Sequence, residues 1–336
     1  MLVDTLVIAF EHVDYREPNL TIEPPAINAV TGELSSHANI AGVRAKKAYL
    51  NLDRVHFTAN TKPLRNGETL LKEYVQFSAP KVLGLDGEII EDFSPGDLSD
   101  ALSMVRNQLK DNGIIADAFK GRLWRVDTAC DITAEYPFAG YGSVFDAMDY
   151  RLSADAHLGS TYRTGNKSVQ WCIYDKKAEL ETRNQDTQHL PDNLIRFEYR
   201  MRKPSKLKRV GFSNVTDLID NFDNLKSETH QGWCDALFSD AWDLYPDMSS
   251  SWLEMLSISL EGGSTRWVAN AIKQLGLLKL KEDGVKPKHL QKFLLDKGVS
   301  HVTAKKYADA LRFAGLSADG AKLYAELKDK VTAQLT

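Results

Sequence analysis

The chain has 336 residues, of which 43% are hydrophobic and 26% charged, and its formal net charge is −4 at pH 7. This length allows one large core but favours two globular domains. The slightly negative charge excludes a protein whose whole surface coats DNA non-specifically. The three cysteines form no Cys-x-x-Cys pair, which excludes a zinc cluster and indicates a reducing compartment.

The first part of the chain predicts strands followed by a helix. Residues 2–10 alternate as a strand; this run is too short to cross a bilayer and lacks the basic start and cleavage site of a signal peptide. We therefore expect a cytoplasmic protein that makes no membrane contact. Residues 47–60 and 73–83 are further expected strands. Ser94-Pro95-Gly96-Asp97 predicts a helix start, with Gly113 as its stop.

Three later strand-like runs, residues 123–132, 169–175 and 194–201, carry polar side chains within an apolar setting. Successive side chains of a strand point to opposite faces, so each run gathers its polar residues on one face. These residues are Arg125, Asp127 and Asp131 in the first run, Gln170, Cys172 and Tyr174 in the second, which Lys176 and Lys177 follow, and Arg196, Glu198 and Arg200 in the third.

The order of the elements predicts an α+β fold, with helices packed on one face of an antiparallel sheet. Residues 160–164 and 169–174 form an expected hairpin in that sheet. After about Gly211 strand signals stop and helical periods take over, so we expect a first domain of residues 1–213 and a mainly helical domain of residues 214–336. The other expected helices cover residues 145–152, 177–182, 215–222, 234–238, 267–275, 288–295, 304–313 and 321–335.

The residue types on the three faces are those of a site that nicks DNA. Asp127, Asp131 and Glu198 are candidate ligands of Mg²⁺ or Mn²⁺, which prefer oxygen ligands. Tyr174 is a candidate nucleophile for a phosphodiester, and Lys176 lies on the same face to stabilise the charge that develops. Each has a simpler alternative, because Tyr174 can be a core tyrosine and the acids can form structural pairs with neighbouring arginines.

Basic residues beside these strands are candidates for contacts with DNA phosphates. One patch runs from Arg200 to Arg209, and a second is Lys176-Lys177. Charge runs are more often solvated faces than binding sites, but both patches flank the acidic strands. The candidate DNA-binding residues are Lys81, Arg125, Lys177, Arg196, Arg200, Arg202, Lys305 and Lys306.

Several short motifs resemble those of a known family. They are Met1–Leu6, Ser78–Leu83, Arg125-Val126-Asp127, Tyr174 with Lys176 and Glu179, and Arg196-Phe197-Glu198 with Arg200. In this order they resemble the replication initiators (gene II proteins) of filamentous phages, with a more distant similarity to rolling-circle plasmid initiators. The resemblance spans roughly residues 1–215.

The resemblance implies a rolling-circle replication initiator with a nicking-initiator-like domain. Such an enzyme is a site-specific single-strand endonuclease that also rejoins strands, and it acts through a covalent tyrosine–DNA intermediate with a divalent metal. By position, the resemblance implies that Tyr174 is the nucleophile, and that Asp127 and Glu198 occupy the family's acidic positions. The implied partners are origin DNA, duplex and single-stranded, together with a host helicase and the replication machinery of a bacterial cytoplasm.

Two other functions remain open from the sequence. One is a non-catalytic DNA-binding regulator of replication, which would not need Tyr174 or the acidic strands. The other is a metal-dependent nuclease that uses water and forms no covalent intermediate. A covalent protein–DNA adduct distinguishes all three.

The helical tail contains a candidate DNA-reading pair. Residues 288–295 and 303–312 predict two short helices around a turn at Gly298. With Lys305 and Lys306 facing outward, the pair has the outline of a helix-turn-helix. A helical packing subdomain is an equally good interpretation.

Overall fold

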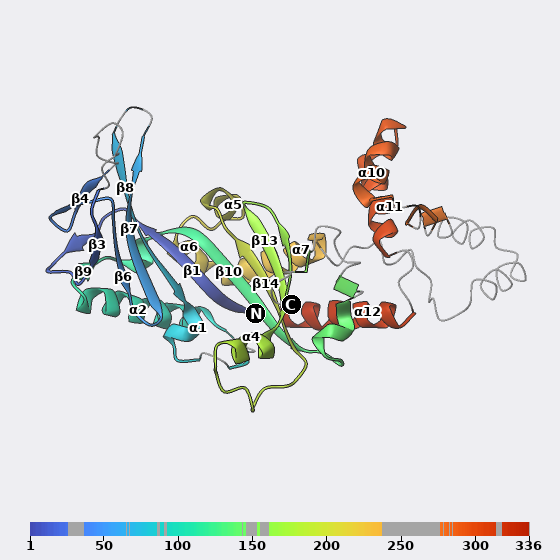
Figure 1. The fold of residues 1–336 in the computed structure, drawn as a ribbon, viewed down its shortest axis with the longest axis horizontal. Helices are drawn as coiled ribbons and strands as arrows, with labels where there is room; N and C mark the ends of the chain where they lie inside the picture. The colour runs from blue at the N-terminus through green and yellow to red at the C-terminus, as the bar shows by residue number, and fades with distance from the viewer. Residues whose placement is uncertain are drawn as a thin grey trace, which may run out of the picture.

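The structure, a computed structural model, describes residues 1–25, 37–64, 66, 68–85, 88–90, 93–142, 144–145, 153–154, 161–236, 276–277, 279–281, 283, 285–313 and 318–335. Its central element is a ten-stranded antiparallel sheet (Figure 1). In spatial order the strands are β11 (Ser153–Ala154), β12 (Thr161–Gly165), β13 (Val169–Asp175), β14 (Leu194–Met201), β10 (Arg122–Thr133), β1 (Leu2–Phe10), β8 (Thr69–Ser78), β7 (Val55–Pro63), β6 (Lys47–Asn51) and β3 (Thr21–Glu23).

Two short strand pairs and several helices complete the described part of the chain. The strand pairs are β2 (Asp14–Tyr15) with β9 (Ile114–Ile115), and β4 (Ala38–Ile40) with β5 (Val43–Ala45). The α-helices are α1 (Ala79–Val82), α2 (Pro95–Asp111), α4 (Lys176–Thr182), α5 (Pro204–Arg209), α6 (Val215–Asp220), α7 (Phe222–Ala236), α10 (Pro287–Asp296), α11 (His301–Phe313) and α12 (Ala318–Leu335).

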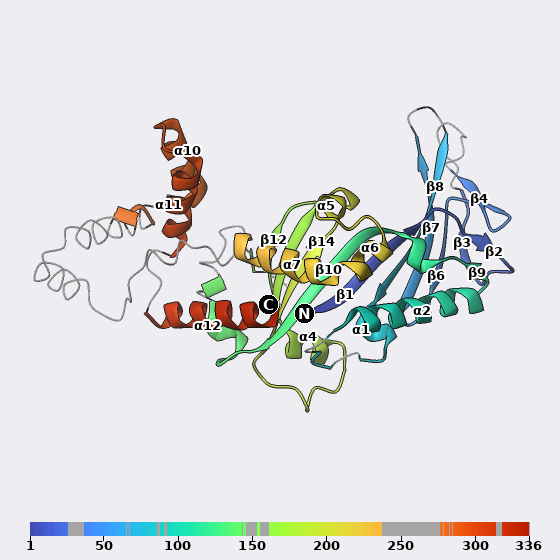
Figure 2. The same cartoon turned by 180° about the vertical axis from the view of Figure 1, so that it is seen from behind.

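Helices α2, α6 and α7 lie on one face of the sheet, in front of it in Figure 2 and behind it in Figure 1. Trp233 of α7 packs edge-on against Phe197 of β14, with ring centroids 5.2 Å apart. Gly232 allows this close approach, because a Cβ there would lie only 2.7 Å from the ring of Tyr199. We call this side the helix face. The opposite side, which carries Asp127, Tyr174 and Glu198, is the polar face.

The expected helix after residue 94 is confirmed as α2. Ser94 caps it, since the Asp97 amide donates to Ser94 Oγ (3.1 Å) and the Ser94 amide donates to Asp97 Oδ2 (2.8 Å). Its apolar residues at helical spacing, Leu98, Leu102 and Val105, are fully buried. The antiparallel sheet and the mixed composition of helices and strands also agree with the expectation.

Two of the expected strands have different bounds. The run of residues 47–60 is two strands, β6 and β7, joined by a tight turn in which the Leu52 amide donates to the Val55 carbonyl (2.9 Å). The run of residues 73–83 ends as a strand at Ser78, and α1 follows with Pro80 in its first turn. Proline has no amide to donate to a sheet, so it favours the start of a helix there.

The hydrophobic core crosses the expected domain boundary between residues 213 and 214. Val215 of α6, Trp233 of α7 and Tyr324 of α12 belong to the same buried cluster as the sheet. The chain ends also meet there, because the Met1 amino group donates to the Gln334 carbonyl (3.3 Å; Figure 1). By contrast, α10 and α11 share a separate cluster that contains Leu290. The expected helix of residues 145–152 is described only at Phe145, and the expected helix of residues 267–275 lies outside the described residues.

No helix in the described ranges is both long enough and apolar enough to span a bilayer.

Candidate functional site

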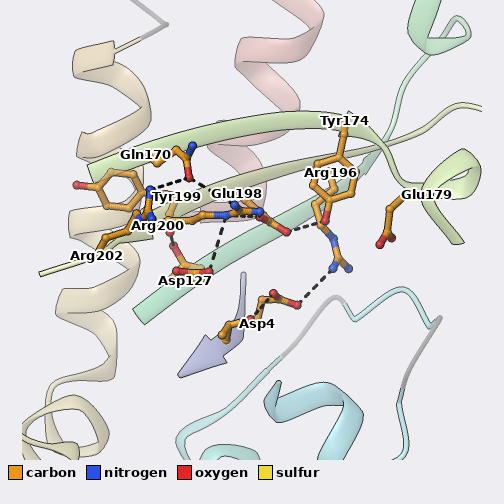
Figure 3. A network of polar contacts seen from close by, with 12 residues as sticks. Asp4, Asp127, Gln170, Tyr174, Glu179, Arg196, Glu198, Tyr199, Arg200 and Arg202 are labelled. Carbon is orange, nitrogen blue, oxygen red and sulfur yellow. Dashed lines mark hydrogen bonds and ion pairs between the residues drawn. The ribbon is translucent and has the colours of Figure 1, made fainter. Parts of the chain in front are cut away.

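The polar face carries the candidate site residues that strand alternation predicts to lie together. Asp127 of β10, Tyr174 of β13 and Glu198 of β14 project to it from three adjacent strands (Figure 3). On the next positions along these strands, Ile173 and Phe197 are fully buried in the hydrophobic core. The arrangement of each strand into one apolar and one polar face is confirmed.

Two β-bulges add further side chains to the polar face. Strand β1 has one extra residue, Asp4, against β10, and β10 has one extra residue, Trp124, against β1. A bulge changes the alternation locally, so adjacent side chains can share a face. Thus Asp4 and Thr5 both line the pocket described next, and Trp124 and Arg125 both line a neighbouring cleft.

The side chains of the polar face surround a pocket of about 380 Å³. Strands β1, β8, β10, β12, β13 and β14, helices α1 and α4 and the segment that follows α1 contribute to it. Within the described residues, seven cationic side chains line the pocket against five carboxylates, which favours an anionic ligand. The cations are Lys81, Arg125, Arg163, Lys176, Arg183, Arg196 and Arg200, and the carboxylates are Asp4, Glu88, Asp127, Glu179 and Glu198.

Tyr174 lies in the pocket wall with its hydroxyl against a carboxylate. The residue is 9% exposed, and its hydroxyl donates to Glu198 Oε1 at 2.6 Å. Burial, and then the Glu198 charge, raise the pKa of Tyr174 well above its ordinary value. The phenol is therefore protonated at neutral pH, and Glu198 is in position to accept its proton.

The other oxygen of Glu198 is held by an arginine that reaches towards Asp127. Arg200 Nε donates to Glu198 Oε2 at 2.7 Å and lies 3.8 Å from Asp127 Oδ2. Arg125 Nε donates to Asp127 Oδ1 at 2.8 Å, and its Nη2 donates to Oδ2. Burial raises the pKa of Asp127 to about 6, although both arginines oppose this shift. Asp127 can therefore exchange a proton near neutral pH.

Asp131 and Arg196 form a buried ion pair across β10 and β14. Arg196 Nε and Nη2 donate to the two carboxylate oxygens of Asp131, each at 2.6 Å. The remaining nitrogen of Arg196 lies 3.5 Å from Asp4 Oδ1 (Figure 3). Arg196 lines the pocket and Asp131 lies beneath it, so Asp131 orients the arginine.

Lys176 lines the pocket from the start of α4. It is buried, and its Nζ donates to Glu179 Oε2 at 2.8 Å. Burial, and then the charge of Arg196, lower the pKa of Lys176. Arg183 pairs with the other oxygen of Glu179. Lys81, from α1, lines the same pocket.

Several predicted DNA-binding residues lie outside this pocket. Lys177 donates to Asp192 Oδ1 at 2.6 Å on the far side of α4. Arg202 is exposed and lines the neighbouring cleft. Lys305 and Lys306 are exposed on α11, which packs against α10 after a turn at Gly298 (φ +80°). The helix pair is thus confirmed, and its role as a reader of DNA remains a prediction.

The carboxylates do not fit a divalent metal as they are arranged. Guanidinium groups hold Asp127, Asp131 and Glu198, so an added Mg²⁺ or Mn²⁺ would face three positive charges. Among the described residues, no three histidine, cysteine or acidic side chains are placed to hold a metal ion. A metal would need Arg125 and Arg200 to leave their carboxylates.

Sequence reasoning missed Asp4, Arg163 and Arg183 as pocket residues. Asp4 had a visible signal, because it is a charge inside an apolar strand. Arg163 shares a strand face with Thr161, and both line the pocket, so alternation along the expected hairpin would have found it. Arg183 follows α4 and pairs with Glu179 at i,i+4 spacing, and no strand pattern points to it.

We compared the chain with protein-family models, with curated proteins and with solved structures, and none of the three comparisons found a match. The resemblance to filamentous-phage initiators therefore depends on the short motifs alone.

Proposed function

We propose that the protein cuts and rejoins one strand of DNA through a covalent link to Tyr174, as a rolling-circle replication initiator does. One observation carries this proposal: the Tyr174 hydroxyl donates to Glu198 in a pocket with a surplus of cations. The pocket is large enough for a phosphodiester and its neighbouring sugars. Arginine is well suited to bind phosphate, because two oxygens of the phosphate can accept two parallel hydrogen bonds from one guanidinium group.

In the proposed cleavage step, the Tyr174 oxygen attacks the phosphorus and its proton passes to Glu198. An O–P bond to tyrosine forms as the bond from phosphorus to the 3′ oxygen breaks. Glu198 suits this role because it already accepts the hydroxyl hydrogen at 2.6 Å. The bond energy is kept in the phosphotyrosine, so the same site can rejoin the strand.

Asp127 is the proposed acid for the leaving 3′ oxygen. Its pKa of about 6 lets it give up a proton during cleavage and take one back from the 3′ hydroxyl during rejoining. Cys172 also lines the pocket, but burial raises the pKa of its thiol to about 11.

The cations around the pocket would stabilise the charge on the phosphoryl oxygens. Arg196 and Arg200 are fixed by Asp131 and Glu198 respectively, so little reorganisation is needed when that charge develops. Lys176 is oriented in the same way by Glu179. The expected Mg²⁺ or Mn²⁺ remains a separate proposal, which requires Arg125 and Arg200 to leave Asp127 and Glu198.

The test is covalent adduct formation with single-stranded DNA on a denaturing gel. Wild-type protein should form an adduct, and Tyr174→Phe should form none while it still binds the oligonucleotide. Tyr199→Phe is the matched control, because Tyr199 also donates to a carboxylate, Glu228 at 2.9 Å, but from the helix face. The control should retain normal adduct formation.

Three results would count against the proposal. An adduct formed by Tyr174→Phe would show that another residue is the nucleophile. Cleavage without any adduct would point to a nuclease that uses water. DNA binding without cleavage, across a set of origin-like sequences, would favour a non-catalytic regulator.

A further inference from the structure

A second cleft, of about 490 Å³, adjoins the pocket on the polar face of the sheet. Arg125 lines both of them. The lining of the cleft comes from β1, β7, β8, β10 and the residue that follows β14. Its residues are Val7, Asn60, Thr61, Lys62, Lys72, Tyr74, Trp124, Arg125 and Arg202, with no carboxylate among those the structure describes.

Two aromatic rings form the floor of this cleft. Tyr74 of β8 and Trp124 of β10 are stacked, with centroids 6.1 Å apart and planes at 11°. The bulge at Trp124 is what turns this indole to the same face as Arg125. Asn60 donates to the Tyr74 hydroxyl at 2.9 Å, which fixes that ring. Both rings are half-buried, so each keeps part of its surface open.

The cations around the rings are poorly compensated. Lys72 Nζ lies 4.3 Å from the centroid of the Trp124 ring. Burial, and then the neighbouring charge of Lys62, lower the pKa of Lys72. An anion in the cleft would relieve this repulsion, and the flexible Lys72 side chain would then leave the indole to meet it.

We propose that this cleft binds single-stranded DNA, with bases stacked on Trp124 and Tyr74 and phosphates held by Lys62, Lys72 and Arg202. Flat rings beside cations suit a single strand, because every unpaired base has a face to stack and a phosphate beside it. In a duplex the faces of the bases are stacked on one another, so they cannot stack on Trp124 and Tyr74. The proposal rests on the proposed function in one respect: the strand in the cleft continues past Arg125 to Tyr174.

The path from the cleft to the pocket is marked by side chains in contact. Gln170 Oε1 accepts from Arg202 at 3.5 Å and from Arg200 at 3.4 Å (Figure 3). Arg200 in turn holds Glu198, the partner of Tyr174. A DNA sugar–phosphate backbone that follows these arginines would pass from the stacked rings of Trp124 and Tyr74 to Tyr174.

Fluorescence anisotropy with labelled oligothymidine tests the cleft without any cleavage. Trp124→Leu keeps an apolar side chain but removes the stacking surface, so affinity should fall roughly 5- to 100-fold. An abasic oligonucleotide of the same length should bind wild type and Trp124→Leu equally. Trp124→Phe should restore most of the affinity, and Tyr136→Leu, which alters an aromatic residue that is 52% exposed elsewhere, should change nothing.

Unchanged oligothymidine binding by Trp124→Leu would overturn the proposal, as would equal losses for the base-bearing and abasic strands. Preference for RNA over DNA of the same sequence would also overturn it. The adduct assay is independent of these measurements. If binding depends on Trp124 but no adduct forms, the cleft binds single-stranded DNA and the proposed nicking function is wrong. If an adduct forms but binding does not depend on Trp124, the nicking function is supported and the proposal for the cleft is wrong.

Discussion

The two faces of the sheet each contain a tyrosine bound to a glutamate, and the pairs differ in what surrounds them. On the helix face, Tyr199 donates to Glu228 at 2.9 Å, and its ring packs against Trp171 with centroids 5.6 Å apart. On the polar face, Tyr174 donates to Glu198 at 2.6 Å in the wall of a cationic pocket. The Tyr199–Glu228 pair joins a helix to the sheet, whereas the Tyr174–Glu198 pair is the one proposed to transfer a proton. The surroundings, more than the residue types, decide the chemistry.

The largest effects are expected at two adjacent residues of β14, because Phe197 points to the helix face and Glu198 to the polar face. Phe197→Ala removes a ring that packs on Trp233, so it should lower the free energy of unfolding by about 3–5 kcal/mol. Glu198→Gln leaves a hydrogen-bond acceptor for Tyr174 but no base, so adduct formation should slow by roughly 10²–10⁴-fold. Urea unfolding and the adduct assay measure the two. A large loss of stability in Glu198→Gln would show that the Tyr174–Glu198 pair has a structural role.

Asp131 should be an exception to this difference between the faces, because it lies on the polar face but has a structural role. Asp131→Asn removes the partner of a buried arginine, so it should destabilise the protein by about 3–5 kcal/mol. Thermal unfolding is the measurement. Asp192→Asn, which breaks the exposed pair with Lys177, is the control and should leave the midpoint unchanged. Normal stability in Asp131→Asn would contradict the structural role.

The proposed reaction should depend on pH through the ionisation of Asp127 on the polar face. The pKa of Asp127 is raised to about 6, so the carboxyl is mainly protonated below that pH and ionised above it. In the proposed mechanism, cleavage uses the acid form of Asp127 and rejoining uses its base form. The ratio of the cleavage rate to the rejoining rate should therefore fall as pH rises through about 6. Asp127→Asn should abolish this dependence, and a wild-type ratio that does not vary with pH would remove Asp127 from the proton transfer.

The exposed lysines of α11 test whether the polar face is the whole DNA-binding surface. If α11 binds duplex DNA, Lys305→Ala with Lys306→Ala should reduce the salt dependence of origin binding by about one unit of slope for each phosphate that is no longer neutralised. Cleavage of a single-stranded oligonucleotide should remain normal. Equal losses in both assays would rule out a separate duplex reader.

Removal of metal should have the smallest effect. The arginines already supply positive charge at Asp127 and Glu198, so adduct formation on single-stranded DNA should persist in EDTA. A complete loss of activity that Mg²⁺ or Mn²⁺ restores would contradict this expectation. It would assign the metal to these carboxylates and show that Arg125 and Arg200 move away from them.

Much of the architecture follows from local patterns in the chain. Alternation is a property of a strand by itself, so it placed Asp127, Tyr174 and Glu198 on faces opposite apolar residues that the structure finds buried. The capped start of α2 is equally local, because Ser94 and Asp97 satisfy each other's amides within one turn. These features needed no knowledge of neighbouring strands.

The tertiary structure alone decided which charges pair and which remain available. Asp131 and Asp127 are equivalent in the sequence pattern, but the register of β10 and β14 sets Arg196 opposite Asp131 and Arg200 opposite Asp127. Asp4 and Trp124 reach the polar face through bulges, which depend on how β1 and β10 are paired. The core likewise crosses residues 213 and 214, because α7 and α12 bury apolar side chains against a sheet formed by distant strands. Register and packing join residues far apart in the chain, and no local pattern encodes them.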